Sequence, residues 1–174
     1  MGSSSVLRQA ALAQPTTVRS EFDRNIEVSH APDAVVGIGG AAQWYYRGSR
    51  NMRAMHFALN NPVGRWYVRR YMGVRTDMTT WPDEHAPNRH EIQPIDPADS
   101  IRAIAPTPVL IVQGTADDYF PVDHGQRLFE AAESVAGNRA ELWVRQGMRH
   151  AEGGTDAALV GEICDWILAR VELP

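Results

Sequence analysis

Lysine is absent from this chain of 174 residues, and all 17 basic residues are arginine, which is typical of a GC-rich bacterial coding sequence. There is a single cysteine, so no disulfide can form within the chain. No apolar run approaches the length of a membrane-spanning helix, and no signal-peptide pattern is found, which together favour a cytoplasmic protein. The net charge of -4 supplies no overall field that would attract nucleic acid.

What is present is the composition of one globular domain. Hydrophobic residues make up 44% and charged residues 22% of the chain, and its length allows a sizeable core. We therefore predict a single domain over residues 1–174. Cys164 lies within the apolar pattern of a helix near the end of the chain, which predicts a buried thiol rather than a reactive one.

From residue 101 onward, short apolar runs alternate with amphipathic stretches. Strands are predicted at 34–38, 109–112 and 142–144. One helix is predicted to begin at Pro121, with Leu128, Phe129, Ala132 and Val135 on one face, before Gly137. Another is predicted after a Thr155 cap and buries Leu159, Ile163, Trp166 and Ile167. This alternation predicts an α/β fold with parallel strands.

An acidic residue and a histidine follow two of these strands. Asp117 stands in Gly-Thr-Ala-Asp-Asp directly after the strand at 109–112, and His150 ends Gly-Met-Arg-His after the strand at 142–144. Parallel strands end at one edge of a sheet, so the two side chains can meet there as a base and its orienting carboxylate. The neighbouring Asp118 is the alternative acid, and it can instead cap the next helix.

These two motifs resemble the α/β-hydrolase family, whose triad runs Ser, then Asp or Glu, then His along the chain. The resemblance assigns the acid to Asp117 and the base to His150 and implies a partial α/β-hydrolase fold of about three parallel strands with flanking helices. It covers residues 101–170 well, 34–60 moderately and 1–13 least. The serine motif G-x-S-x-G is missing, although residues 1–8 resemble that elbow cut immediately after its serine. The alternative for residues 1–5 is a cloning scar or a flexible start.

Residues 44–75 combine arginine with aromatic side chains and hold no acidic residue. Such a segment is able to bind single-stranded nucleic acid or an anionic membrane. Residues 77–99 supply six acidic residues as local counter-charges, which favours a helical cap over the sheet instead. We therefore predict a cap or insert over residues 44–100. We expect neither nucleic acid nor a membrane as a partner.

Cofactor and metal signals are weak. Residues 37–42 fit G-x-G-x-x-A, but no helix or acidic residue follows as a dinucleotide site requires, so the glycines are predicted to allow a tight exit from the strand. His85, His90 and Glu91 match no zinc spacing. We therefore expect no cofactor and no metal. Residues 14–33 are polar and unpatterned, which predicts a loop or a partly disordered segment.

Two functions remain open at this stage. The first is the C-terminal part of a serine hydrolase that acts on a small ester-like substrate when completed by its nucleophile, the chain alone being inactive. The second is a non-catalytic remnant that binds anionic ligands through residues 44–75 or serves in assembly. The strand at 34–38 would lie beside a missing strand, which predicts self-association through an exposed sheet edge.

Overall fold

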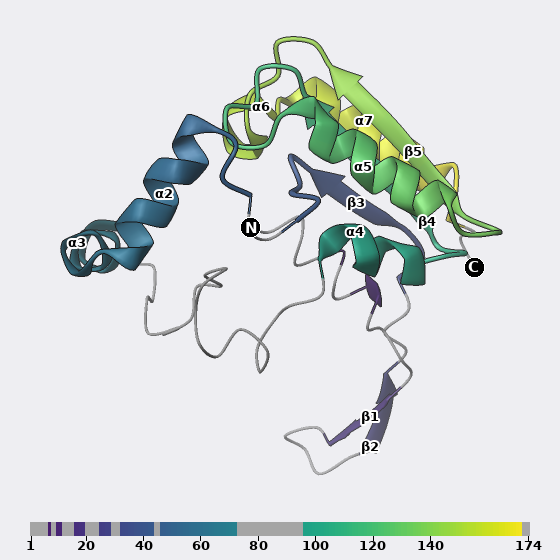
Figure 1. Ribbon diagram of the computed structural model, residues 1–174. Helices are drawn as coiled ribbons and strands as arrows, with labels where there is room; N and C mark the ends of the chain where they lie inside the picture. The colour runs from purple at the N-terminus through teal and green to yellow at the C-terminus, as the bar shows by residue number, and fades with distance from the viewer. Residues whose placement is uncertain are drawn as a thin grey trace.

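The computed structural model describes residues 7, 10–11, 16–19, 25–28, 32–43, 46–72 and 96–171. Its strands are β1 (Thr16–Arg19), β2 (Asn25–Val28), β3 (Val35–Ile38), β4 (Pro108–Gly114) and β5 (Arg139–Arg145). Its helices are α2 (Arg50–Asn60), α3 (Pro62–Met72), α4 (Pro97–Ser100), the 3-10 turn η1 (Ile101–Ala103), α5 (Val122–Glu133), α6 (Ala151–Gly154) and α7 (Ala157–Leu168). Figure 1 shows them in place.

The centre of the fold is a parallel sheet of three strands in the order β3-β4-β5. All seven residues of β4 are buried, as expected for the middle strand of a sheet that is covered on both faces. The three predicted strands and their parallel pairing are confirmed, with β4 and β5 each longer than the apolar run that predicted them. In this sheet β3 lies at one edge and has β4 as its neighbour.

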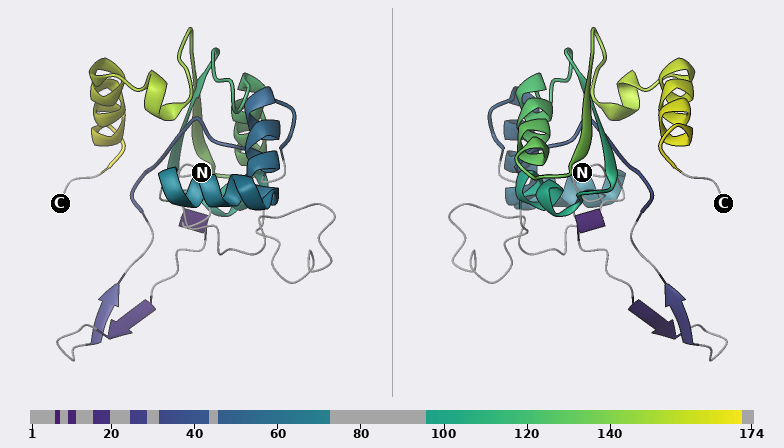
Figure 2. Two further views of the ribbon diagram at one scale, coloured as in Figure 1. Left: turned by 90° about the vertical axis from the view of Figure 1, so that its left-hand side faces the viewer. Right: turned by 90° about the vertical axis from the view of Figure 1, so that its right-hand side faces the viewer.

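The two faces of the sheet are covered by different helices. Val109 and Ile111 of β4 pack in one core cluster with Leu128 of α5, and Leu7 from the start of the chain joins them. Leu110 and Val112 point the other way and pack with Ile163 and Trp166 of α7. Figure 2 shows α5 and α7 on opposite sides of the sheet. The alternation of side chains along β4 thus determines which helix each residue meets.

The predicted helices after β4 and β5 are present, with differences at their ends. In α5, Leu128 and Ala132 are buried as predicted and Phe129 is partly buried, but Val135 lies beyond the end of the helix. In α7 the N-cap is Asp156, whose side chain accepts a hydrogen bond from the backbone N–H of Leu159, so the predicted Thr155 cap is wrong. The Thr155 hydroxyl donates instead to the carbonyl oxygen of Ala151 in α6.

The prediction of a buried Cys164 is wrong, because this thiol is exposed. The buried residues of α7 are Leu159, Ile163 and Trp166, which recur at steps of four and three. Cys164 follows Ile163 directly, and one residue is about 100° of rotation around an α-helix. The buried side chains near it in the sequence, Ile163 and Trp166, therefore belong to a face that Cys164 does not share.

Residues 16–19 and 25–28 also depart from the prediction of an unpatterned loop. They form the antiparallel pair β1-β2, with Thr16 opposite Val28 and Arg19 opposite Asn25. β1 contains two threonines and a valine, β2 contains an isoleucine and a valine, and these β-branched residues favour extended backbone. The strands are only four residues long, which is why the polar residues around them dominated the sequence pattern.

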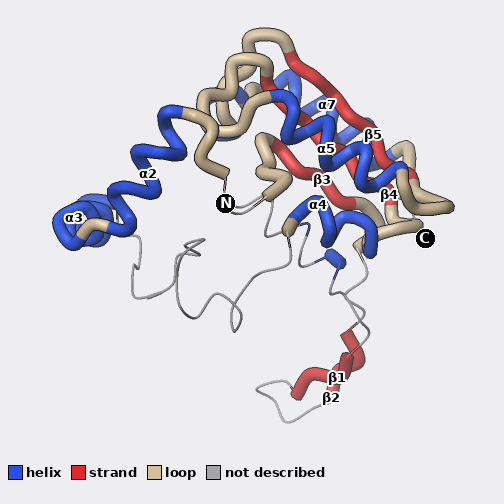
Figure 3. Tube along the Cα trace, viewed as in Figure 1, coloured by secondary structure: helices blue, strands red, loops and turns tan. Residues whose placement is uncertain are grey.

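The helices α2 and α3 lie next to one another, away from the sheet, as Figure 3 also shows. Ser49 caps α2 by accepting a hydrogen bond from the N–H of Met52. Met52 is buried in a small cluster with Ala41 and Phe120, which attaches the start of α2 to the rest of the fold. Phe57, Trp66, Tyr67 and Tyr71, in contrast, are exposed. That residues 44–100 serve as a cap stays a prediction. No helix among the described residues is long and apolar enough to cross a membrane.

Candidate active site

The loop that follows β4 holds Asp117 in a fixed conformation. Its carboxylate oxygen Oδ1 accepts hydrogen bonds from the backbone N–H groups of Tyr119 and Phe120, both at 2.9 Å. The loop begins at Gly114, where an added Cβ would lie 2.1 Å from the carbonyl oxygen of Met148. Glycine at this position therefore lets the loops after β4 and β5 approach each other, and Ala116 N–H donates to the same Met148 carbonyl.

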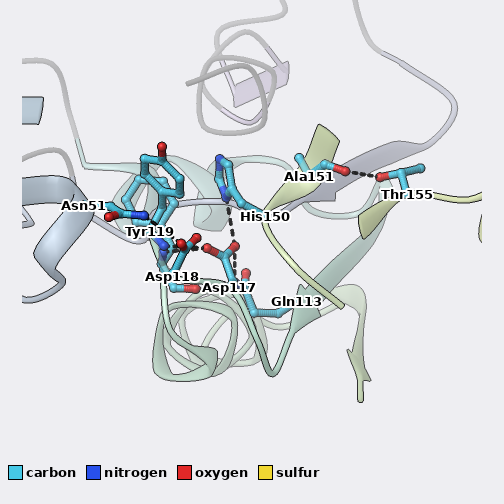
Figure 4. A network of polar contacts seen from close by, with 9 residues as sticks. Asn51, Gln113, Asp117, Asp118, Tyr119, His150, Ala151 and Thr155 are labelled. Carbon is cyan, nitrogen blue, oxygen red and sulfur yellow. Dashed lines mark hydrogen bonds and ion pairs between the residues drawn. The ribbon is translucent and has the colours of Figure 1, made fainter. Parts of the chain in front are cut away.

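His150 comes to the same place from β5. The chain turns at Gly147, whose φ of 71° favours glycine, and His150 then precedes α6. The ring nitrogen Nδ1 lies 2.9 Å from Oδ2 of Asp117. The side chain of His150 is 24% exposed and that of Asp117 is fully buried, so His150 is the member of the pair that solvent can reach. Figure 4 shows the two side chains pointing toward each other from their separate loops.

Aromatic rings surround the histidine. The ring centroid of Tyr119 lies 4.8 Å from that of His150, and the centroid of Phe120 lies 5.6 Å from it. Both aromatic residues belong to the loop between β4 and α5 that also carries Asp117. The same short segment therefore holds the acid through its backbone N–H groups and contacts the base through its side chains.

Burial and hydrogen bonding act in opposite directions on the pKa of Asp117. Burial alone would raise this pKa, because it disfavours the charged carboxylate. Hydrogen bonds from the His150 side chain and from the N–H groups of Phe120 and Tyr119 outweigh burial, so the pKa lies below its ordinary value. Asp117 is therefore a buried carboxylate that stays ionised at neutral pH.

The second acid of the Asp-Asp pair has a different environment. Asp118 is exposed, and its Oδ2 accepts a hydrogen bond of 2.7 Å from Nδ2 of Asn51 in α2. It makes none of the contacts to His150 that Asp117 makes. Of the two acids that the sequence left open, the structure brings only Asp117 together with His150.

Gly39 lies close to both Asp117 and His150. It directly follows β3 with a φ of 60°, which is consistent with the tight strand exit predicted for residues 37–42. A Cβ at this position would lie 3.3 Å from each of three atoms, namely Oδ2 of Asp117, Nδ1 of His150 and the backbone nitrogen of Ala151. This turn, which also fitted a weak nucleotide-binding pattern in the sequence, thus packs against the contact between acid and base.

Sequence reasoning missed two polar residues beneath the pair, Gln113 and His124, both of which are fully buried. Gln113 donates from Nε2 to Asp117 and to the carbonyl oxygen of Phe120. His124 accepts a hydrogen bond at Nδ1 from the N–H of Ala42, and burial lowers its pKa. Gln113 directly follows the predicted strand 109–112 and His124 lies in the predicted helix that begins at Pro121, but a single polar residue at either position gives no signal of what it contacts.

The described residues contain no group of three or more metal-binding side chains, and His85, His90 and Glu91 lie outside them.

A cavity of about 720 Å³ lies between the end of β5 and the start of α7. It is lined by residues 147–149 of the loop that leads to His150, but neither Asp117 nor His150 lines it. Within the described part of the chain the partners of His150 are Asp117, Tyr119 and Phe120, and none of them is a serine. Residues 1–5, which resemble a cut elbow, also lie outside the described part of the chain.

Comparison with known proteins places the chain in a family. Residues 46–172, more than half of the chain, match the model of the prolyl oligopeptidase family, Peptidase_S9. This match spans both loops that carry Asp117 and His150. No curated protein matches the sequence.

Two solved structures are similar in part. Acyl-protein thioesterase 2 from Zea mays is 26% identical over 49% of this chain and 34% of its own, with a TM-score of 0.35. A truncated form of carbohydrate esterase from gut microbiota is 14% identical over 97% of this chain and 56% of its own, with a TM-score of 0.48. The chain thus spans about a third and just over half of these two proteins, and the family assignment depends on the family match. On that match, the chain belongs to the prolyl oligopeptidase family, a family of α/β-hydrolases.

Proposed function

We propose that this chain is the C-terminal part of a serine hydrolase that cleaves a carboxylic ester or a related acyl bond, with Asp117 as the acid and His150 as the base of a Ser-Asp-His triad. The observation that carries the proposal is the 2.9 Å contact between Nδ1 of His150 and Oδ2 of Asp117. The family match supports the reaction class, because it covers both residues.

The geometry suits proton transfer. With Nδ1–H donated to Asp117, the remaining ring nitrogen Nε2 is the one that can accept a proton from an attacking hydroxyl. The imidazolium that then forms lies against a buried carboxylate that is already ionised, which stabilises it. His150 would return the proton to the leaving alcohol or amine, and a water molecule would later release the acyl group by the same route.

The nucleophile would come from a G-x-S-x-G segment that the sequence does not contain. As given, the chain is therefore expected to show no hydrolysis by a serine mechanism. In a serine protease that has the same triad on an unrelated fold, removing the nucleophile costs about 10⁶ in rate.

The test has two parts. Turnover of a para-nitrophenyl ester by the purified chain should be absent, and turnover that a serine-directed phosphonate abolishes would contradict the proposal. Adding an N-terminal half that carries an elbow from the same family should produce activity, and His150→Ala in the completed protein should remove it. Activity that survives His150→Ala would also contradict the assignment of the base.

A second proposal concerns assembly through β3. Gly39 N–H donates to Val112 of β4, so by the alternation of a strand the N–H groups of Val36 and Ile38 point to the open edge of the sheet. An apolar edge of this kind recruits other strands. We expect the isolated chain to self-associate at micromolar concentration, as measured by sedimentation.

Val36→Pro is the matched variant for this proposal, because it removes one outward N–H and the preceding Val35 already has the extended backbone that proline favours. The variant should shift the chain toward monomer. A monomeric unmodified chain would contradict the proposal, and so would a Val36→Pro variant that stays folded and associates equally well.

A further inference from the structure

We propose that Gln113 is the positioning residue of the site, holding the Asp117 carboxylate in the orientation that His150 requires. This inference rests on the proposed roles of Asp117 and His150. Gln113 is the sixth of the seven residues of β4, and its side chain is fully buried. It lies against α5 at Gly125, where an added Cβ would come within 2.8 Å of the Cβ of Gln113. The absence of a side chain on Gly125 therefore makes room for the glutamine.

The neighbours of the Gln113 amide determine which way it faces. The carbonyl oxygen of Phe120 lies 2.6 Å from Nε2 and Oδ2 of Asp117 lies 3.2 Å from it. Both neighbours are hydrogen-bond acceptors, so only the NH₂ end of the amide can face them. The other end, Oε1, is buried and has no hydrogen-bond partner among the described residues. The two donated bonds therefore account for the placement of this side chain.

The two oxygens of Asp117 are then held in different ways. Oδ1 accepts from two backbone N–H groups, while Oδ2 accepts from Gln113 and lies against His150. Without Gln113, the His150 ring that Asp117 is meant to orient would be the only contact of Oδ2 within the described part of the chain. The Gln113 amide supplies an independent second anchor, so the carboxylate is fixed before His150 contacts it. The bond to Phe120 also fixes the segment whose aromatic rings contact the histidine.

The test follows the tautomer of His150 by ¹⁵N NMR on the chain as it stands, with the signal assigned by its loss in His150→Ala. The Gln113→Met variant keeps the length of the side chain and removes its donors. We expect His150 to shift from the Nδ1–H form toward the Nε2–H form, because the carboxylate that selects Nδ1–H is no longer fixed. Gln126→Met, on the exposed face of α5, is the matched control and should leave the His150 signals unchanged.

A double-mutant cycle separates positioning from general loosening of the fold. In an Asp117→Asn background, Gln113→Met should cause no further shift of His150, because no carboxylate remains to be positioned. An unchanged His150 signal in Gln113→Met would overturn the proposal. An equal shift with and without Asp117 would overturn it as well.

If Gln113→Met does not fold, the Gln113 side-chain amide of the otherwise unmodified protein supplies the readout. Its NH₂ protons should move in Asp117→Asn, because the new NH₂ group takes the place of Oδ2 and faces them. Unchanged Gln113 signals would contradict the proposal. None of these measurements requires hydrolysis, so an inactive completed enzyme would count against the proposed function and not against the role of Gln113.

Discussion

The carboxyl ends of β4 and β5, where the loops carry Asp117 and His150, differ sharply from the helix pair α2-α3. This end of the sheet is called the sheet edge below. At the sheet edge, both oxygens of the buried Asp117 carboxylate have hydrogen-bond partners. Oδ1 accepts from two backbone N–H groups, and Oδ2 contacts Gln113 and His150. On the helix pair, Trp66 and Tyr71 are mostly exposed although they contact each other, with ring centroids 5.9 Å apart. The sheet edge is thus a completed set of interactions, whereas the helix pair presents side chains whose packing is not completed by the described residues.

This difference predicts which substitutions matter. Changes at the sheet edge should alter chemistry, while changes on the exposed face of α3 should alter little. The links between the two regions are the buried Met52 and the hydrogen bond from Asn51 to Asp118. Asp118 therefore belongs with the helix pair, although it is next to Asp117 in the sequence.

The largest expected effect is that of Asp117→Asn in the protein completed with an elbow half. Because the imidazole would lose the carboxylate that selects its tautomer, kcat should fall by about 10⁴. Asp118→Asn is the matched control and should leave kcat within a few-fold of the unmodified value, since it removes only the contact to Asn51. Steady-state kinetics on the ester substrate measure both, and a more damaging Asp118→Asn would reverse our choice of acid.

The next effect concerns Gly39 and uses Gly137 for comparison. Both have positive φ, 60° and 77°, so alanine at either position should cost about 1 kcal/mol of unfolding free energy. A Cβ at Gly137 meets nothing within 4 Å, whereas a Cβ at Gly39 meets both Asp117 and His150. Only Gly39→Ala should also shift the ¹⁵N signals of His150. Equal shifts in the two variants would show that the close approach of Gly39 to Asp117 and His150 does not affect His150.

Acid stability supplies a smaller test. The pKa of Asp117 is lowered in the folded state, so its contribution to stability is present above the pKa of an unfolded aspartate, about 3.9, and is lost as pH falls through the folded value. Denaturant unfolding of the chain should therefore show a fall in unfolding free energy below about pH 4. The fall should be shallower in Asp117→Asn, and parallel curves for the two proteins would contradict the lowered pKa.

The smallest effect is expected on the exposed face of α3. Trp66→Ala should change the unfolding free energy by no more than about 0.5 kcal/mol, because the ring is mostly in solvent. Val68→Ala, on the buried face of the same helix, should cost more than about 1 kcal/mol. A larger loss of unfolding free energy in Trp66→Ala would mean that the ring is buried against a part of the chain or a second copy.

The arginines of this region also make a binding prediction. Labelled single-stranded DNA should bind the chain more weakly than micromolar at physiological salt, in line with the net charge of -4. Tighter binding that weakens steeply with added salt would favour the alternative of an anionic-ligand module, and would move the function of the chain from the sheet edge to the helix pair.

The sequence predicted the sheet well for a physical reason. Val109 to Val112 form an unbroken apolar run because the central strand is buried on both faces, and such runs are visible without any partner. The same holds for the two strand-end motifs, since a parallel sheet brings its strand ends together by geometry alone. The meeting of these two loops could therefore be expected from their places in the chain, whereas the choice of Asp117 over Asp118 came from the resemblance to the α/β-hydrolases.

Other features depend on contacts that no local pattern encodes. Cys164 shares an apolar stretch with Ile163 but lies on another side of the helix, so composition gave the wrong burial. Gln113 and Gly39 have their roles through atoms that lie in other segments of the chain, which only the folded arrangement brings near. The four-residue strands β1 and β2 are too short for a periodic signal to stand out from polar neighbours.

The tautomer of His150 in the unmodified chain tests the central claim most directly. A ¹⁵N NMR spectrum, recorded at a pH where the ring is neutral, distinguishes a proton on Nδ1 from one on Nε2. The contact between Nδ1 and the ionised Asp117 predicts that the proton resides on Nδ1 and that Nε2 is free to act as the base. A spectrum with the proton on Nε2 would contradict the account, because Asp117 would then not be orienting the base.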